Sequence, residues 1–156
     1  MSADLTAKAN TSGFRGLHSE ITEKVIGVFF EVHNELGGGF LESVYQQALR
    51  IALGQAGLHV SLEVPVPVYF RGAVVGNFRA DIVVNESVLL ELKAVSALDG
   101  AHDGQVLHHL RATRFEVGML LNFGPRPQFR RFILEDEKKK ICALPRESAV
   151  EALRDC

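Results

Sequence analysis

The spacing of the apolar residues changes near Gly57, and this change limits the fold to a few classes. From Glu20 the apolar residues recur every three or four positions, which predicts an amphipathic helix that ends at the glycines 37–39. A second helix is predicted from about Leu41 to Leu53, closing near Gly57. Beyond that glycine the apolar residues alternate with other residues, which indicates strands. The sequence therefore predicts two helices followed by a sheet.

The rest of the chain is predicted to form strands on either side of a helix. Strands are expected at 60–68, 77–84, 88–94, 117–123 and 129–134, with helices from Asp99 to about Thr113 and from Pro145 to about Leu153. Pro65 and Pro67 place the first strand at an edge or in a bent pair, because proline cannot donate to a neighbouring strand. Strands on either side of a crossover helix imply an α/β (α+β) fold with a mixed sheet flanked by helices.

Length and composition favour one domain in the cytoplasm. The chain has 156 residues and is 47% hydrophobic, which suits a single core. We expect a flexible arm over residues 1–18 and one domain over 19–156. An apolar run of about 20 residues, as a membrane span needs, is absent from the sequence, and so is the apolar core of a signal peptide. Cys142 and Cys156 have neither zinc-ligand spacing nor the number expected of a disulfide scaffold, so both are interpreted as bystanders.

The net charge is −2, so any role with nucleic acid must depend on a local basic patch or on a metal ion. The best local candidate is the segment 126–140, with six basic and three acidic residues. A charged surface strand and turn is the favoured interpretation of this segment, and a phosphate-binding patch is the alternative.

The two strands around residue 86 bring charged residues together. A turn at 85–87 pairs 84 with 88, 82 with 90 and 80 with 92. This register aligns the apolar face expected at 78, 80, 82 and 84 with the apolar face at 88, 90, 92 and 94. It also places Asp81 opposite Glu91, with Lys93 further along the same face and Arg79 across from Lys93. Opposed residues have Cβ atoms about 5 Å apart, so the two carboxylates would repel each other unless a cation lay between them.

Mg²⁺ suits this arrangement, because it takes one or two carboxylates together with water and substrate phosphate. A neighbouring lysine could orient or deprotonate the attacking water. The alternative is a solvated outer face on which the four charged residues form simple cross-strand ion pairs.

Several motifs, taken in order, resemble one family of small prokaryotic proteins. The run Gly39-Phe40-Leu41-Glu42-Ser43-Val44-Tyr45 resembles the motif that names the GxxExxY family, and 33–37 before it is similar too. The later segments 79–81, 90–95 and 120–124 are similar to that family's acidic strand, its Glu-x-Lys strand and its last block. The resemblance covers about residues 18–135.

This family is grouped with the PD-(D/E)xK nuclease-like superfamily, whose fold is a mixed sheet flanked by helices. The resemblance implies that Asp81 and Glu91 are metal ligands for Mg²⁺ or Mn²⁺. It further implies that Lys93 is the catalytic lysine and that Glu42 is the acidic residue of the preceding helix. Glu42 and Tyr45 are three residues apart and so share a helix face.

Other positions have weaker assignments. Superfamily relatives with a Gln-x-x-x-Tyr helix imply a supporting role for Gln105, and this chain has His109 where the tyrosine is expected. Tyr45 and His33 have structural interpretations beside the functional ones: a half-buried core aromatic whose hydroxyl finds a partner, and a helix-capping or packing histidine.

Two functions remain from this reasoning. The first is a metal-dependent nuclease that hydrolyses phosphodiester bonds in DNA or RNA. The second is a non-catalytic nucleic-acid- or protein-binding module on the same fold. The complete set of Asp81, Glu91 and Lys93 favours the enzyme. The expected partners are nucleic acid and a second copy of the chain.

Overall fold

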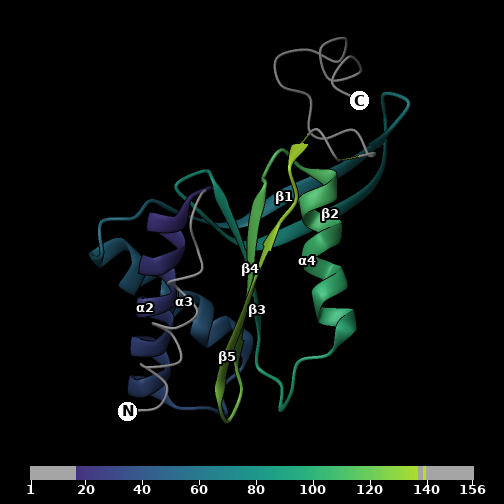
Figure 1. Ribbon diagram of the computed structural model, residues 1–156. Coiled ribbons are helices and arrows are strands. Elements are labelled where there is room, and N and C mark those ends of the chain that lie inside the picture. Colours follow the sequence, from purple (N-terminus) through teal and green to yellow (C-terminus); the bar gives the residue numbers. More distant parts are fainter. Residues whose placement is uncertain (1–16, 137–138, 140–156) are drawn as a thin grey trace.

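The computed structural model describes residues 17–136 and residue 139. Its elements are α2 (Ser19–Leu36), α3 (Glu42–Gln55), β1 (Val60–Phe70), β2 (Ala73–Val84), β3 (Val88–Lys93), α4 (Gly100–Ala112), β4 (Val117–Phe123) and β5 (Pro127–Ile133) (Figure 1). Most of the expected N-terminal arm, the expected C-terminal helix and both cysteines lie outside the described residues. Within those residues, no helix has both the length and the hydrophobicity needed to cross a membrane.

The five strands form one mixed sheet in the order β1-β2-β3-β4-β5. Strands β3 and β4 are parallel and are connected through α4, whereas the other neighbours are antiparallel. Strand β1 lies at the edge and carries Pro65 and Pro67, as their chemistry requires. The predicted mixed sheet flanked by helices is confirmed.

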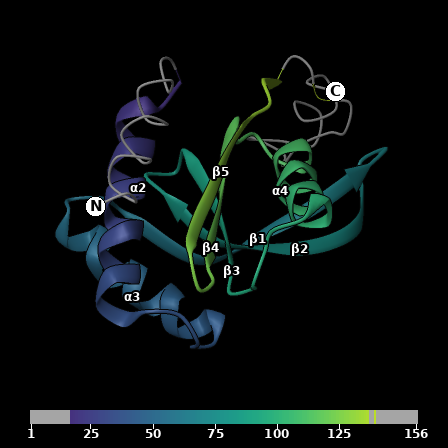
Figure 2. The same cartoon turned by 60° about the horizontal axis from the view of Figure 1, so that its bottom comes forward.

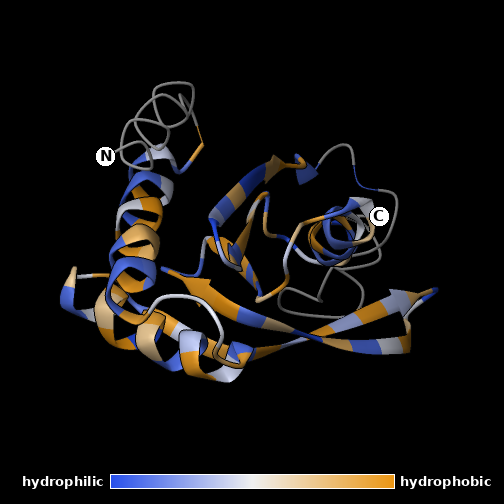
Figure 3. Cartoon of the chain, turned by 90° about the horizontal axis from the view of Figure 1, so that it is seen from below, coloured by the Kyte–Doolittle hydropathy of each residue, from blue (hydrophilic) through white to orange (hydrophobic). Residues whose placement is uncertain are grey.

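The helices cover opposite faces of this sheet. Figures 2 and 3 show α2 and α3 on one side of the strands and α4 on the other, with the long β1–β2 hairpin passing beside α4. Two buried clusters correspond to these faces. One includes Phe29, Leu49, Ile82 and Leu90, and the other includes Val66, Leu89 and Leu110. The two central strands, β3 and β4, are therefore buried on both faces.

Helix α4 approaches β4 very closely at Gly118. A Cβ atom added there would lie 2.9 Å from Cγ1 of Val106. Asp99 fixes the start of the helix, because its side chain accepts hydrogen bonds from the backbone N–H groups of Ala101 and His102. These two features place the inner face of α4 directly over the strands that carry the candidate site.

The expected turn and register are confirmed where β2 and β3 pair, which is over Ile82–Leu90, Val83–Leu89 and Val84–Val88. The ladder ends there, so the expected backbone pairing of 80 with 92 is absent. The expectation that 78, 80, 82 and 84 share one apolar face is also wrong, because Ala80 packs in the α4 cluster while Ile82 packs against α2 and α3.

Ala80 and Ile82 pack on different faces of the sheet because of a local irregularity in β1. Glu63 has φ +49°, a left-handed conformation, and it interrupts the β1–β2 ladder between Leu62–Ile82 and Val64–Ala80. Because adjacent strands bend together, the alternation of β2 slips by one position at Asp81.

Candidate active site

Strands β2 and β3 diverge after the Ile82–Leu90 pair, and we call the region of Asp81 and Glu91–Lys93 the open end of this strand pair. The opposite end, with Val84, Val88 and the turn 85–87, is the closed end. At the open end the side chain of Asp81 replaces the missing backbone acceptor, since its Oδ2 accepts a hydrogen bond from the N–H of Leu92 at 2.8 Å. Asp81 is thus part of the strand connection as well as a candidate ligand.

Glu91 lies next to Asp81 and is almost completely buried, with 1% of its surface exposed. Nδ1 of His109 on α4 donates a hydrogen bond to its Oε1. The Asp81 and Glu91 carboxyl groups lie close enough for each to shift the pKa of the other. The structure therefore brings together the two carboxylates that the strand register predicted.

Both carboxyl groups are electrostatically unfavourable in their ionised form. Burial raises the pKa of Asp81, the Leu92 N–H opposes this rise, and the negative charge of Glu63 adds to it. Burial also raises the pKa of Glu91, while the hydrogen bond from His109 opposes the rise and the nearby Asp81 charge adds to it. A cation placed between the two groups would relieve this repulsion.

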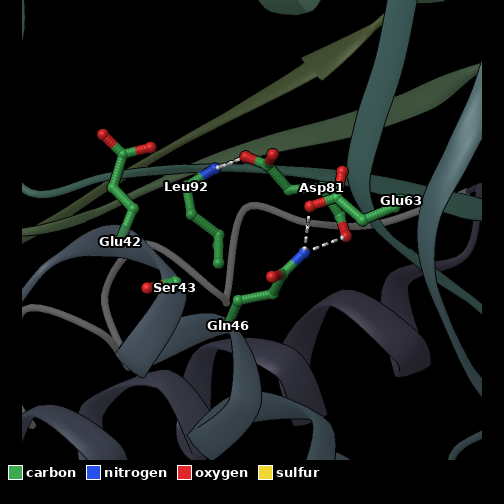
Figure 4. A pocket seen from close by; sticks show the side chains of 6 residues that line it. All are labelled: Glu42, Ser43, Gln46, Glu63, Asp81 and Leu92. Carbon is green, nitrogen blue, oxygen red and sulfur yellow. Dashed lines mark hydrogen bonds between the residues drawn. The ribbon is translucent and has the colours of Figure 1, made fainter.

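A small cavity of about 150 Å³ opens beside Asp81, toward α3. Figure 4 shows the six residues that line it: Glu42, Ser43, Gln46, Glu63, Asp81 and Leu92. Glu42 reaches this cavity from the start of α3, as the resemblance implied. We name this space the acidic pocket, because three of its lining residues are carboxylates.

Gln46 and Glu63 are among the residues of the acidic pocket that the sequence analysis did not single out. Nε2 of Gln46 donates hydrogen bonds to the backbone oxygen of Asp81 at 2.9 Å and to Oε1 of Glu63 at 3.2 Å. Gln46 lies four positions after Glu42 on the same helix face, a signal that was present in the sequence. Glu63 occupies an intervening polar position of an alternating strand, and only the β1–β2 register shows that it lies opposite Asp81.

Lys93 lies at the open end of the strand pair, whereas Arg79 lies beside β1. The charge of Lys93 lowers the pKa of Asp81, so its half-buried side chain lies at the open end with the carboxylates. Arg79 pairs with Pro65 of β1, and its Nη1 donates to the backbone oxygen of Glu63 at 3.5 Å. The expected position of Arg79 across from Lys93 is wrong, because β2 has already left β3 at that point.

Tyr45 and His33 hold the loops around the site. The Tyr45 hydroxyl donates to the oxygen of Gly37 at 2.6 Å and accepts from the N–H of Phe40 at 3.2 Å. Its ring stacks on Phe123 with centroids 4.3 Å apart, and His33 stacks on the same phenyl ring. Nε2 of His33 lies 2.8 Å from the oxygen of Gly124. The packing interpretation of both residues accounts for these contacts.

Gln105 lies apart from the acidic pocket. It lines a second cavity between β2 and α4, together with Phe78, Ala101, Gly104, His108 and His109. His109 connects the second cavity to the candidate metal ligands, because its ring lines this cavity and its Nδ1 binds Glu91. The structure brings His109 to the candidate ligands and leaves Gln105 one helical turn away.

The donor set suits a hydrated Mg²⁺ better than a closed protein cage. Over residues 17–136 and 139, no three His, Cys, Asp or Glu side chains are arranged to hold an ion by themselves. Two carboxylates in contact beside an open pocket match the preference of Mg²⁺ for few protein ligands and several waters.

Three of the basic residues in the segment 126–140 have partners within the described part of the protein. Nη1 of Arg130 forms an ion pair with Asp103 at 2.6 Å, and Nη2 of Arg131 donates to the oxygen of Leu17 at 2.6 Å. Nζ of Lys139 donates to the oxygens of Thr113 and Phe115, both at 2.7 Å. These contacts favour the interpretation of this segment as a charged surface over that of a phosphate-binding patch.

A mixed five-stranded sheet with helices on both faces, and with an aspartate and a Glu-x-Lys strand at one open end, defines a fold of the nuclease type. The family model described as the PD-(D/E)XK nuclease superfamily matches residues 19–132. The chain therefore belongs to this superfamily. No curated protein matches the chain significantly.

One solved structure, "Crystal structure of SSO0001", is similar in fold, with a TM-score of 0.44 and 20% sequence identity. The match covers 88% of this chain and 65% of the other, so the chain spans less than two thirds of that protein.

Proposed function

We propose that the protein is a divalent-metal-dependent nuclease of the GxxExxY type, acting on phosphodiester bonds in DNA or RNA. The observation that carries this proposal is the hydrogen bond from the Leu92 N–H to the Asp81 carboxylate, which places that carboxylate beside Glu91 and Lys93, the two neighbours of Leu92. Membership of the PD-(D/E)XK nuclease superfamily supports it.

The residues at the open end have distinct roles in this proposal. Asp81 and Glu91 hold Mg²⁺ or Mn²⁺, and Glu42 adds an oxygen from across the acidic pocket. The Leu92 N–H and the His109 ring fix the two carboxylates, while Gln46 donates a hydrogen bond to the neighbouring Glu63. When bound, the metal neutralises the negative charge that develops on the phosphate.

Lys93 orients the attacking water and accepts a proton from it. Its side chain is half-buried beside Asp81, where an ammonium group can also balance charge on a bound phosphate. Gln105 has a supporting role through the same helix that carries His109. We further propose that nucleic acid is the partner, that the domain spans 19–156, that the protein is cytoplasmic and that it forms a homodimer.

A second candidate, a non-catalytic binding module, is favoured by one observation. Oε1 of Glu91 is already bonded to His109, which leaves fewer oxygens free for an ion. Such a module would retain the fold and the carboxylate contact without turnover.

The test compares cleavage and metal binding in matched variants. Labelled single- and double-stranded DNA and RNA are incubated with wild type, Asp81→Asn, Lys93→Met and Glu86→Gln in Mg²⁺ or Mn²⁺. Glu86 is an exposed carboxylate at the closed end of the same strand pair, so Glu86→Gln is the charge-matched control. We expect cleavage by wild type and Glu86→Gln, and at least about a hundredfold loss in the other two.

Calorimetric titration of Mg²⁺ separates the two candidates. Metal binding to wild type without cleavage of any of the four substrates supports the binding module. Equal metal binding by wild type and Asp81→Asn contradicts the site itself.

A further inference from the structure

The second cavity, between β2 and α4, has a volume of about 380 Å³ and a lining unlike that of the acidic pocket. Its residues are Phe78, Ala101, Gly104, Gln105, His108 and His109. We name it the aromatic pocket. A volume in the range of about 300–1,000 Å³ is typical of sites that take a small organic group.

The walls of this pocket combine an apolar ring with polar edges. Phe78 has 49% of its surface exposed, and its ring centroid lies 5.6 Å from that of His109 at an interplanar angle of 44°. Gln105 supplies an amide and His108 an imidazole from neighbouring turns of α4. One open ring face beside side-chain donors and acceptors fits a flat aromatic group with a hydrogen-bonding edge.

Small residues on α4 keep the pocket open. Ala101 and Gly104 lie on the face of the helix that lines it, and a Cβ atom added at Gly104 would meet nothing within 4 Å. A larger side chain at this position would project into the empty space without striking the protein.

The aromatic pocket is one side chain away from the candidate metal ligands. His109 forms part of its wall, and Nδ1 of the same ring binds Glu91. A phosphate attached to a group held in the pocket can therefore reach the open end of β2 and β3.

We infer that the aromatic pocket receives an unpaired nucleobase of the nucleic acid on which the protein acts, an inference that rests on the proposed function. Stacking on an exposed aromatic ring together with hydrogen bonds to a base edge is how proteins hold bases that are free of a duplex. The ligand chemistry is that of a nucleobase, presented either by a single strand or by a free nucleoside. The substrate class is accordingly single-stranded or locally unpaired nucleic acid.

The first test fills the pocket. Gly104→Leu places a side chain in the space that a base would occupy, and Gly27→Leu makes the same change on the exposed side of α2, where a Cβ atom also meets nothing within 4 Å. Binding of short fluorescein-labelled oligothymidine and oligoadenosine strands is measured by anisotropy in EDTA, which prevents cleavage. We expect Gly104→Leu to weaken binding about tenfold, the effect of losing one stacked base, and Gly27→Leu to bind like wild type.

The second test removes the stacking surface. Phe78→Ala is compared with Phe70→Ala, a similarly exposed ring at the far end of the same hairpin. Only Phe78→Ala should weaken binding. An abasic strand of equal length should bind wild type weakly and be insensitive to Gly104→Leu. Thermal unfolding of all four variants checks that each is folded.

The source of the base is resolved with nucleosides. Shifts of the Phe78 ring resonances on addition of adenosine or thymidine report binding of the base alone, whereas shifts only with the strands show that the sugar-phosphate chain is also needed. Equal strand binding by Gly104→Leu and wild type, equal binding of the abasic strand, or failure of wild type to bind any strand overturns the inference.

These tests distinguish failure of the aromatic-pocket inference from failure of the nuclease proposal. If Gly104→Leu weakens strand binding but no substrate is cleaved, the pocket stands and the nuclease proposal fails. If Asp81→Asn abolishes cleavage and Gly104→Leu changes neither binding nor cleavage, the nuclease proposal stands and the base pocket fails.

Discussion

The closed and open ends of the β2–β3 pair are built by different means. At the closed end, backbone groups pair in a regular ladder and the side chains around Val84 and Val88 are buried and apolar. At the open end the ladder is absent, and side chains bind the backbone instead. Asp81 accepts from Leu92, and the amide of Asn122 accepts from the N–H of Val95 and donates to its oxygen.

This difference shows where the chain can carry reactive groups. In a regular ladder the backbone groups bind one another, whereas at the divergent end the Asp81 carboxylate lines a pocket bordered by α3 and the buried Glu91 binds His109 of α4. The side chains that maintain the divergence should therefore be more sensitive to substitution than the turn at the closed end.

The largest expected effect is at Gly124, just beyond the open end. A Cβ atom there would lie 2.1 Å from the oxygen of Val95, so Gly124→Ala must displace backbone. We expect the free energy of unfolding, measured with urea, to fall by about 3 kcal/mol or more. Gly54→Ala on α3, where a Cβ atom meets nothing within 4 Å, is the control, and an equal effect of the two would contradict the close approach.

Asn122 should rank next. Its side chain is fully buried and binds both backbone groups of Val95, at 3.0 and 2.9 Å. Asn122→Leu leaves these groups without their partner, which should cost about 2–3 kcal/mol in the same measurement. Gln128→Leu removes a longer, 3.4 Å contact to the same amide and should cost much less.

Substitution of Asp81 should raise the stability of the fold although it removes a residue needed for the proposed function. Because burial raises its pKa in the folded state, the ionised carboxylate destabilises the fold at neutral pH, a penalty absent below the unfolded pKa. In EDTA at neutral pH, Asp81→Asn keeps an acceptor for Leu92 and should raise the free energy of unfolding.

Asp81→Ala, which loses that acceptor, should be less stable than Asp81→Asn by about 1 kcal/mol. Added Mg²⁺ should raise the melting temperature of wild type but not of Asp81→Asn. A wild type more stable than Asp81→Asn in EDTA would show that the carboxylate repulsion is unimportant.

The smallest effect is expected at the closed end. Asn85 and Glu86 both have positive φ, +51° and +53°, which glycine adopts more readily. Glu86→Gly should raise the free energy of unfolding by about 0.5 kcal/mol. Asn85→Gly should gain less, because it also loses the hydrogen bond from the N–H of His59 to the Asn85 side chain. A Glu86→Gly variant less stable than wild type would contradict this account.

The same contrast explains what the sequence could predict. The closed-end turn and the register from Val84–Val88 to Ile82–Leu90 follow from alternating apolar residues, which is a local signal. The left-handed Glu63, the early divergence of the strands and the position of Arg79 depend on how β1 bends, which alternation does not encode. The Glu91–His109 contact depends on the placement of α4 over Gly118, so only the tertiary structure shows it.

The prolines of β1 have a consequence for how copies of the chain can meet. In a strand that pairs on one side only, a proline nitrogen must point outward, so positions 65 and 67 offer pyrrolidine rings where other residues would offer N–H donors. Growth of the sheet by addition of a foreign strand at this border is thereby blocked, which protects the long hairpin from fibril-like aggregation.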